Sequence, residues 1–370
     1  MKKLMAIVLS AALMLSLVAC GAPKKDDGKD VAGGKVHVFY YNYGDTYIST
    51  VREALSKILT DAKVDFQDYD ANSNQTTQTE QIQTAITSGA SMLVVNIVET
   101  ASDDAAKTII ELAKAKDIPV LFFNREVSDE MVNSYAKCAF IGTDAAEAGH
   151  MQGTMIAENL LKNYDAVDLN KDGVISYVMF KGQEGNPEAT FRTQFSVEDA
   201  DKALIAGGKK ALKFYDDKNK DKYLVDQDGN WSAAAASNYM TTLLTKYNEA
   251  SKNMPEIIIC NNDGMAEGAI SALQTAGFNV KDGKKIIPVF GVDATAAAKA
   301  LIADGVMAGT IKQDSDAMAT AIGKAVSAGT AGKELFADMA DYKKDEKAAK
   351  VRIPYAIYTG EAAPEAPAKK

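Results

Sequence analysis

Carboxylate and carboxamide side chains recur just beyond the short apolar runs of this chain. These side chains belong to Asp45, Asn124, Asn186, Asn262, Asp293 and Gln313. Tyr47 lies two residues after Asp45 and is counted with them. Carboxylate and amide oxygens accept hydrogen bonds and amide nitrogens donate them, so these side chains can pair the hydroxyl groups of a neutral polyhydroxylated ligand. Asp and Asn are also favoured helix N-caps, so each residue alone has a structural explanation. Because so many share one placement, we predict a binding site.

A second cluster of oxygen donors lies in residues 168–176, which follow the pattern of a calcium-binding loop. The candidate ligands, at loop positions 1, 3, 5, 7 and 9, are Asp168, Asn170, Asp172, the Val174 carbonyl and Ser176. Met179 stands at position 12, where a bidentate glutamate belongs, and residues 175–180 resemble a strand and not a helix. The segment is therefore either an Asp/Asn-rich turn without metal or a calcium site whose last carboxylate comes from elsewhere.

Short apolar runs alternate with helix-like segments along the whole chain. The strand-like runs are residues 35–40, 91–98, 119–123, 175–180, 256–260, 286–290 and 307–311. After the first run, Ile48, Val51 and Leu55 follow at spacings of three and four, which places them on one helix face. Continuous apolar strands between helices indicate parallel sheets with helices on both faces, so the predicted fold class is α/β. In such sheets ligands bind beyond the carboxyl ends of the strands, where the polar residues above occur.

Residues 1–20 have the features of an export signal. A basic start is followed by the apolar run 4–18, which is shorter than the ~20 apolar residues of a transmembrane helix. Small residues precede Cys20, which resembles the lipid-modified cysteine of bacterial lipoproteins; the alternative is an ordinary signal peptide in which Cys20 is incidental. Residues 21–34, rich in Gly, Lys and Asp, are expected to form a flexible tether.

Composition excludes several classes of protein. A net charge of -9 argues against a nucleic-acid-binding protein. Only His37 and His150 are available for histidine-based catalysis, and no Cys/His cluster suggests zinc. Cys138 and Cys260 lie in apolar runs and are expected to pack as small hydrophobic residues, although a disulfide between them stays open. Since single cores stop growing at roughly 250–300 residues, two lobes are expected.

Taken in order, these features resemble the galactose/glucose branch of the bacterial periplasmic sugar-binding proteins, which serve ABC-type importers. The resemblance covers about residues 35–360 and includes YNYGDTYISTVREAL, IPVLFFNRE, DLNKDGVI, FKGQEGNPEATFR, EIIICNNDGMAEGAI and IPVFGVDA. It implies a hexose clamped between two lobes, with the aromatic rings of Tyr47 and Trp231 on its two faces. The polar residues that match the family's sugar-binding positions are Asp45, Asn124, Asn186, Glu188, Arg192, Asn262, Asp293 and Gln313.

The resemblance also completes the calcium site, because the family's remaining ligand maps to Glu256. A structural Ca²⁺ is therefore expected. Several positions depart from the family pattern: Asn186 replaces a histidine, Glu188 an aspartate and Gln313 an asparagine, while Tyr47 stands where phenylalanine is common. These differences leave open whether the ligand is galactose, glucose or another monosaccharide.

By the same resemblance, residues 35–143 and 314–350 form the N-terminal lobe, residues 144–313 and 351–362 the C-terminal lobe, and residues 363–370 a tail. Strands crossing near residues 143, 313 and 351 act as the hinge. The closed receptor, a monomer without enzymatic activity, docks on a membrane permease, and the lipid on Cys20 holds it on the extracytoplasmic face.

Two other classes of function stay open in the sequence. A glycosidase could use Asp45 with Glu188 or Asp293 as paired carboxylates. A sugar-responsive repressor of this fold would need an N-terminal DNA-binding unit, where the export signal stands. The Lys- and Asp-rich segment 209–230 is longer than usual and has no functional interpretation at this level.

Overall fold

The computed structural model describes residues 34–360 of the chain. The export signal, the lipid-modified Cys20 and the tether up to residue 33, all expected from the sequence, lie outside the described residues, as does the tail 363–370. No helix within residues 34–360 is long and apolar enough to cross a membrane.

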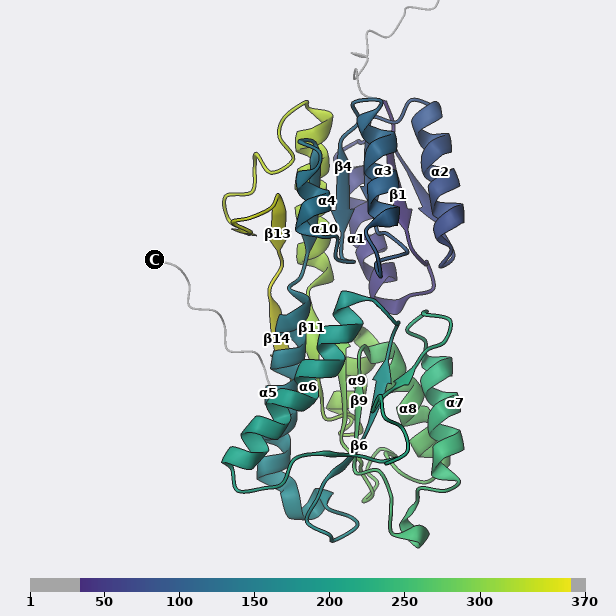
Figure 1. Ribbon diagram of the computed structural model, residues 1–370, viewed down its shortest axis with the longest axis vertical. Helices are drawn as coiled ribbons and strands as arrows, with labels where there is room; N and C mark the ends of the chain where they lie inside the picture. The colour runs from purple at the N-terminus through teal and green to yellow at the C-terminus, as the bar shows by residue number, and fades with distance from the viewer. Residues whose placement is uncertain (1–33, 361–370) are drawn as a thin grey trace, which may run out of the picture. The chain divides into compact units, whose positions relative to one another are not determined.

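The first lobe is built on a sheet with the strand order β12-β13-β5-β4-β3-β1-β2. Its strands are β1 (Val36–Tyr40), β2 (Phe66–Asp70), β3 (Met92–Val95), β4 (Val120–Phe123), β5 (Cys138–Gly142), β12 (Lys343–Lys344) and β13 (Lys350–Arg352). One face packs against α1 (Thr46–Asp61) and α10 (Ser315–Thr330). The opposite face packs against α2 (Gln75–Thr87), α3 (Asp104–Lys114) and α4 (Asp129–Asn133) (Figure 1).

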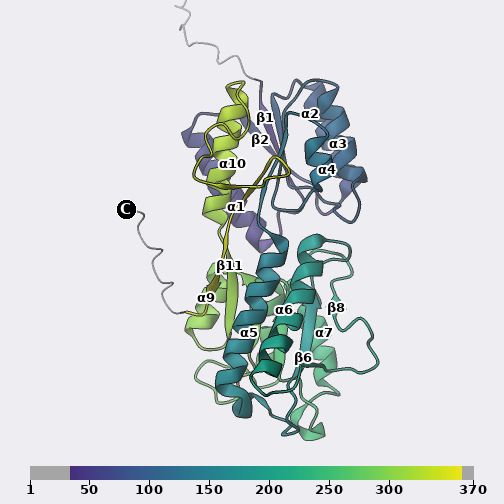
Figure 2. The ribbon, with the colours of Figure 1, turned by 60° about the vertical axis from the view of Figure 1, so that its left-hand side comes forward.

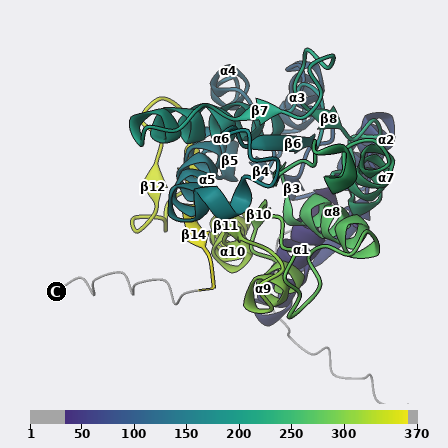
Figure 3. The same cartoon turned by 90° about the horizontal axis from the view of Figure 1, so that it is seen from below.

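The second lobe is built on a sheet with the order β14-β11-β10-β9-β6-β7, and β8 also pairs with β6. Its strands are β6 (Ser176–Lys181), β7 (Lys213–Phe214), β8 (Leu224–Val225), β9 (Ile257–Cys260), β10 (Val289–Asp293), β11 (Gly309–Gln313) and β14 (Tyr355–Tyr358). Helices α5 (Ala145–Val167) and α6 (Pro187–Ala206) cover one face (Figure 2). The other face carries α7 (Ala233–Leu244), α8 (Asp263–Thr275) and α9 (Ala296–Ala303), seen from below in Figure 3, and the short 3-10 helix Glu249–Ser251 precedes β9.

The hydrophobic pattern explains both layers. Every residue of β1, β3 and β4 is buried, because helices cover both faces of the sheet, and on α1 the residues Ile48, Val51 and Leu55 point into the core as their spacing predicts. The α/β fold class is confirmed. The sheets are not wholly parallel, since β12 pairs antiparallel with β13 and β14 antiparallel with β11, both where the chain returns near its C-terminus.

Three short connections join the lobes. Residues 143–144 link β5 to α5, Asp314 links β11 to α10, and residues 353–354 link β13 to β14. The predicted lobe boundary at residue 351 therefore falls inside β13, which pairs with β5 in the first sheet. The two cysteines of the described region lie in different sheets, Cys138 in β5 and Cys260 in β9, and both are buried free thiols, so they form no disulfide with each other.

Candidate functional site

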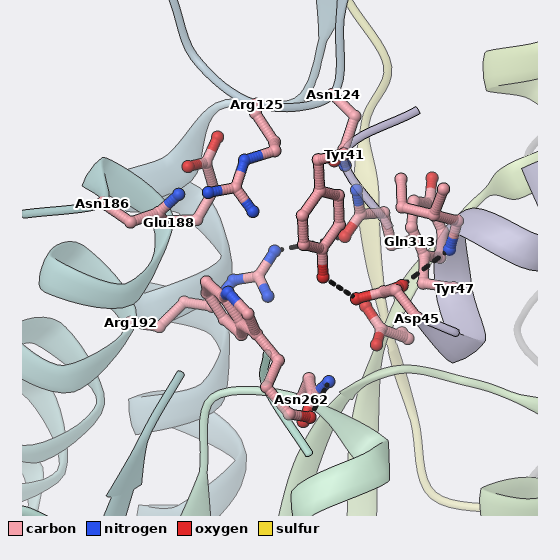
Figure 4. A pocket seen from close by; sticks show the side chains of 13 residues that line it. Tyr41, Asp45, Tyr47, Asn124, Arg125, Asn186, Glu188, Arg192, Asn262 and Gln313 are labelled. Atoms are coloured by element: carbon pink, nitrogen blue, oxygen red, sulfur yellow. Dashed lines mark hydrogen bonds between the residues drawn. The ribbon is translucent and has the colours of Figure 1, made fainter. Parts of the chain in front are cut away.

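A pocket with a cavity volume of about 40 Å³ lies between the two lobes, next to the carboxyl ends of strands of both sheets (Figure 4). All ten residues predicted from the sequence to bind a sugar line it, together with three that were not predicted. The lining residues are Tyr41, Asp45, Tyr47, Ile48, Asn124, Arg125, Asn186, Glu188, Arg192, Trp231, Asn262, Asp293 and Gln313.

Three of the lining residues are also helix N-caps. Asp45 Oδ1 accepts the Ile48 amide at 2.7 Å at the start of α1. Asn186 and Asn262 do the same for α6 and α8, each accepting a backbone amide at 2.9 Å. These three residues therefore both cap helices and line the pocket. Capping fixes one oxygen of each side chain, and the second polar atom of Asp45, Asn186 and Asn262 is hydrogen-bonded to the Tyr41 hydroxyl, the Thr100 hydroxyl and the Trp231 carbonyl, respectively.

Backbone strain gathers at the strand ends that reach the pocket. Asn124, after β4, has φ of 63°, and Asp293, at the end of β10, has φ of 126°. Asn tolerates the left-handed region, whereas the Asp293 conformation is rare for a residue with a side chain. Such strain costs on the order of 1–3 kcal/mol and persists where the surroundings over-determine it, commonly at ligand sites.

Trp231 forms one wall of the pocket and packs face-on against Gly182. Its side chain is buried, and a methyl group at Gly182 would come within 2.0 Å of the indole ring. The Trp231 carbonyl accepts a hydrogen bond from Asn262 Nδ2 at 3.1 Å. Tyr47, from the first turn of α1, is also buried and lines the pocket from the other lobe. The two rings predicted to sandwich a ligand thus come from opposite lobes.

Arg192 is one of the two buried cations of the site. Its Nη1 donates to the Asn261 carbonyl at 2.9 Å, and its Nη2 donates to Gln313 Oε1 at 3.1 Å and to the Tyr355 hydroxyl at 2.9 Å. Burial acts against its charge, but Tyr355 and the carboxylates of Asp293 and Glu188 keep the pKa of Arg192 above its ordinary value. A permanently charged fork of donors is therefore fixed at the pocket floor.

Two carboxyl groups of the pocket, those of Asp293 and Glu188, lose their protons less readily than usual. Burial, with repulsion from Asp263, raises the pKa of Asp293 well above its ordinary value, and Arg192 only partly opposes this. Burial, with repulsion from Glu126, also raises the pKa of Glu188. Arg125 is buried beside Glu188 (Figure 4). Two guanidinium groups facing three carboxylates leave the site near neutrality, which suits an uncharged ligand better than an ionic one.

Six polar atoms of the lining are buried without a hydrogen-bond partner among residues 34–360. They are Tyr47 Oη, Arg125 Nε, Glu188 Oε2, Arg192 Nε, Trp231 Nε1 and Gln313 Nε2. A buried group left unpaired costs about 1–3 kcal/mol, so their concentration in one pocket points to partners supplied from outside the chain. The set contains donors and acceptors, and a ligand rich in hydroxyl groups can satisfy both kinds.

The three lining residues not predicted from the sequence are Tyr41, Ile48 and Arg125. The Tyr41 hydroxyl donates to Asp45 Oδ2 at 2.5 Å, and the Arg125 guanidinium lies 4.2 Å from the centre of the Tyr41 ring. Arg125 also donates to the Val98 carbonyl at 2.9 Å and to Gln183 across the lobes. Tyr41 directly follows β1 and Arg125 is the second residue after β4, and this position after a strand is the signal that could have identified them.

Comparison with known proteins decides the family. A model of the periplasmic binding protein domain matches residues 36–334. This chain belongs to the periplasmic binding protein family. It is 34% identical over 335 residues to the D-galactose/methyl-galactoside binding periplasmic protein MglB of Haemophilus influenzae, covering 88% of this chain and 89% of that one. The resemblance stated from the sequence is confirmed.

Solved structures show the same fold. An ABC transporter solute binding protein from Bacillus halodurans with bound myo-inositol superposes with a TM-score of 0.66 at 21% identity, over 90% of this chain and 96% of that one. Another, from Clostridium phytofermentans with bound β-D-glucose, gives 0.66 at 22% identity, over 88% and 94%. The matched relatives are solute-binding proteins and not enzymes, so the glycosidase hypothesis is not supported.

In this periplasmic binding protein the loop 168–176 is hydrogen-bonded to Glu256. Glu256 Oε1 accepts the Asn170 amide at 2.9 Å, while Oε2 accepts both the amide (2.7 Å) and the hydroxyl (2.9 Å) of Ser176. The two oxygens of Asp168 accept the amides of Asp172 and Gly173 at 3.2 and 3.0 Å. The predicted ligands are therefore neighbours in space.

The donor chemistry of this loop fits a hard cation. Within residues 34–360 no three Asp, Glu, His or Cys side chains are grouped closely enough to hold a metal alone, so Asn170, Ser176 and the Val174 carbonyl would have to complete the set. Oxygen donors of mixed charge are what Ca²⁺ takes. Burial raises the pKa of Glu256, and Asp168 adds a smaller contribution in the same direction.

Proposed function

We propose that this chain is an extracytoplasmic receptor that captures a hexose, galactose or glucose, and delivers it to an ABC-type importer. The observation that carries the proposal is the convergence, in one pocket between two lobes, of hydrogen-bonding side chains with unpartnered atoms and two aromatic walls. Apolar C–H faces of a sugar pack on aromatic rings, and its hydroxyls pair with the carboxylates, amides and Arg192. Family membership supports the receptor role.

The choice among sugars rests on the printed ligands of the relatives and on the pocket chemistry. The Haemophilus influenzae relative supports galactose, while the solved neighbours hold β-D-glucose and myo-inositol. A different monosaccharide in the same fold is the alternative. Gln313 and Glu188 support a ligand with hydroxyl groups opposite them, because Gln313 Nε2 and Glu188 Oε2 have no hydrogen-bond partner within residues 34–360, and a ligand without matching hydroxyls leaves them unpaired.

A structural calcium ion forms part of the proposal. Asp168, Asn170, Asp172, Val174, Ser176 and Glu256 would hold it. The ion would supply positive charge between the carboxylates of the loop, and the loop would tie the end of α5 to the strand β9. The ligands lie at the opposite ends of β6 and β9 from the pocket, so the ion has no direct part in ligand binding.

We further propose that Cys20 carries a lipid that retains the receptor at the membrane beside its permease. The sequence features of residues 1–20 support this, and they favour an exported receptor over a cytoplasmic repressor. Two acyl chains on one cysteine would meet the need for more than one chain in stable anchoring. Metabolic labelling with a palmitate analogue, compared with a Cys20→Ala variant, tests the anchor; equal labelling of the two proteins refutes it.

Calorimetric titration of the protein beginning after Cys20 tests the ligand. The panel is galactose, glucose, ribose, xylose and myo-inositol. Tight binding of galactose or glucose, with at least tenfold weaker binding of the pentoses, supports the proposal. Preference for a pentose or for myo-inositol supports the receptor function but assigns a different ligand to it. No binding of any member contradicts the sugar assignment.

A further inference from the structure

The segment 209–230 ends in a tight loop that leads directly into the pocket wall. Residues 226–230 connect β8 to Trp231 and to the start of α7. Asp226 is buried, and its Oδ2 accepts both the amide (2.9 Å) and the hydroxyl (2.8 Å) of Ser232, the N-cap of α7. Its Oδ1 accepts the Asp228 amide at 3.1 Å. One carboxylate therefore fixes both ends of this loop against the second lobe.

Asn230 extends from that loop to the first lobe. Its Oδ1 accepts the Ser73 hydroxyl at 2.6 Å and Asn42 Nδ2 at 3.4 Å, and Asn42 Nδ2 also donates to Ser73 Oγ at 2.9 Å. We call Asn42, Ser73 and Asn230 the inter-lobe triad. Its two first-lobe members lie in the loops that follow β1 and β2, at the edge of the pocket.

The first-lobe side of the triad is anchored to residues of the pocket. The Ser73 amide donates to the Tyr41 carbonyl at 2.7 Å, and Ser73 itself has φ of 58°. Asn42 Oδ1 accepts the Gly44 amide at 2.7 Å, just before Asp45. Tyr41 and Asp45 line the pocket and are hydrogen-bonded to each other. Asn230 thus contacts, through Asn42, the loop that carries Tyr41 and Asp45 and, through Ser73, the neighbouring loop that is hydrogen-bonded to it.

On the second-lobe side, Asn230 immediately precedes Trp231, whose backbone is strained. Trp231 has φ of 56°, a left-handed conformation that is a genuine outlier for a bulky residue. Gly229, two residues earlier, has φ of 64°. The strain is held on one side by the contacts of Asp226 and Asn262 and on the other by the Asn230 side chain. A contact made only when the lobes meet therefore acts on the residue next to the indole.

We propose that Asn230 is a positioning residue that couples lobe closure to the placement of Trp231 against the ligand. This inference rests on the proposed sugar-binding function. The triad unites atoms of both lobes, so its hydrogen bonds exist in the closed form and are lost on opening. Removing them weakens the closed complex without touching the ligand, and the effect falls on dissociation because association begins from the open form.

Stopped-flow binding with the fluorescence of Trp231, the only tryptophan, measures both rates directly. The proteins are wild type, Asn230→Ala, Ser73→Ala and their double variant, titrated with D-galactose and D-glucose. The matched control is Gln227→Ala in the same loop, because Gln227 is exposed and its side chain donates only to the Val225 carbonyl, at 3.5 Å. Thermal melts without sugar check that each variant is folded.

The expected result is a dissociation rate about tenfold higher in Asn230→Ala, with an association rate within about twofold of wild type, since one to two hydrogen bonds are worth about 1–2 kcal/mol. Ser73→Ala breaks the triad from the other lobe, and the double variant is expected to be little worse than either single one. Gln227→Ala is expected to match wild type. Rates of Asn230→Ala equal to those of the control, or additive effects in the double variant, overturn the inference.

If wild type binds no sugar, the proposed function fails and this inference fails with it. If wild type binds sugar and Asn230→Ala dissociates at the rate of Gln227→Ala, the inference alone is refuted. Ser73→Ala serves for the same comparison if Asn230→Ala does not fold.

Discussion

Gly182 is the position at which the smallest change should most affect the pocket. It follows β6 and faces the indole of Trp231: an added methyl would meet three ring atoms at 2.0, 2.1 and 2.5 Å. Real Cβ contacts do not come so close, so in a Gly182→Ala variant the ring has to move. Gly182 does not have a positive φ, and the hydrogen bond that its amide donates to Asn261 Oδ1 at 3.1 Å can persist in the variant. The substitution therefore acts on the ring alone.

The expected magnitude follows from the cost of overpacking. Forcing an extra methyl into a packed site costs typically about 1–3 kcal/mol, and here the strain is relieved by displacing a pocket wall. We expect Gly182→Ala to weaken sugar binding by about 10- to 100-fold, measured by calorimetric titration, and to shift the Trp231 emission to longer wavelength because the ring loses burial.

Gly264 provides the matched control. It also lies beside Trp231, but a methyl there would meet its nearest atoms, including the Trp231 carbonyl oxygen, only at 3.5 Å, which is ordinary contact. Gly264 is in the first turn of α8, where alanine is favourable. Gly264→Ala is expected to bind within about twofold of wild type. Unchanged affinity and emission in Gly182→Ala would refute the assignment of Trp231 as a wall of the ligand site.

Three further outcomes are expected. Arg192→Lys should weaken sugar binding at least about tenfold in calorimetry, because an ammonium group cannot make all the hydrogen bonds that the guanidinium donates to Asn261, Gln313 and Tyr355. Near-normal affinity would show that Arg192 does not contribute to the site. Glu256→Gln should abolish the rise in Tm that calcium gives wild type, and an undiminished rise would exclude Glu256 as a ligand. Burial raises the pKa of Asp263 from 3.8 to about 7, so the folded protein binds this proton more tightly than the unfolded chain and stability falls as pH rises between those values. Asp263→Asn should reduce that slope in melts across this pH range, and parallel wild-type and variant curves would contradict the shift.

Local pattern in the sequence predicted the layers and seven of the thirteen pocket residues, whereas Glu188, Arg192 and Trp231 were predicted only from the family resemblance. Continuous apolar runs such as residues 119–123 mark strands buried on both faces, and polar residues at their ends then meet at one edge of the sheet. The strand β2 (FQDYD) carries no such signal, since it lies at the edge of its sheet and is only half-buried. Near the pocket, Tyr40, Tyr41 and Tyr43 look alike in the sequence, and only the fold directs Tyr41 toward Asp45.

The inter-lobe triad could not be predicted from the sequence, for a different reason. Asn230 lies 188 residues from Asn42 and 157 from Ser73, and each of the three is an ordinary surface residue in its own loop. Their meeting depends on how the lobes close and on the length of the segment before Trp231, neither of which has a periodic signature. The same holds for Glu256, which sequence spacing could not connect to the calcium loop; only the resemblance to a family did so.

The N-caps of the pocket join fold and function in single residues. Asp45, Asn186 and Asn262 each accept a hydrogen bond from an amide at the start of a helix, and all three line the pocket. A cap is worth about 1 kcal/mol to the helix, so removing one is expected to lower stability as well as affinity. Asp45→Asn keeps an oxygen for the Ile48 amide but cannot accept from Tyr41 through its nitrogen. Its two roles should therefore separate in this variant, with stability nearly kept and affinity lost.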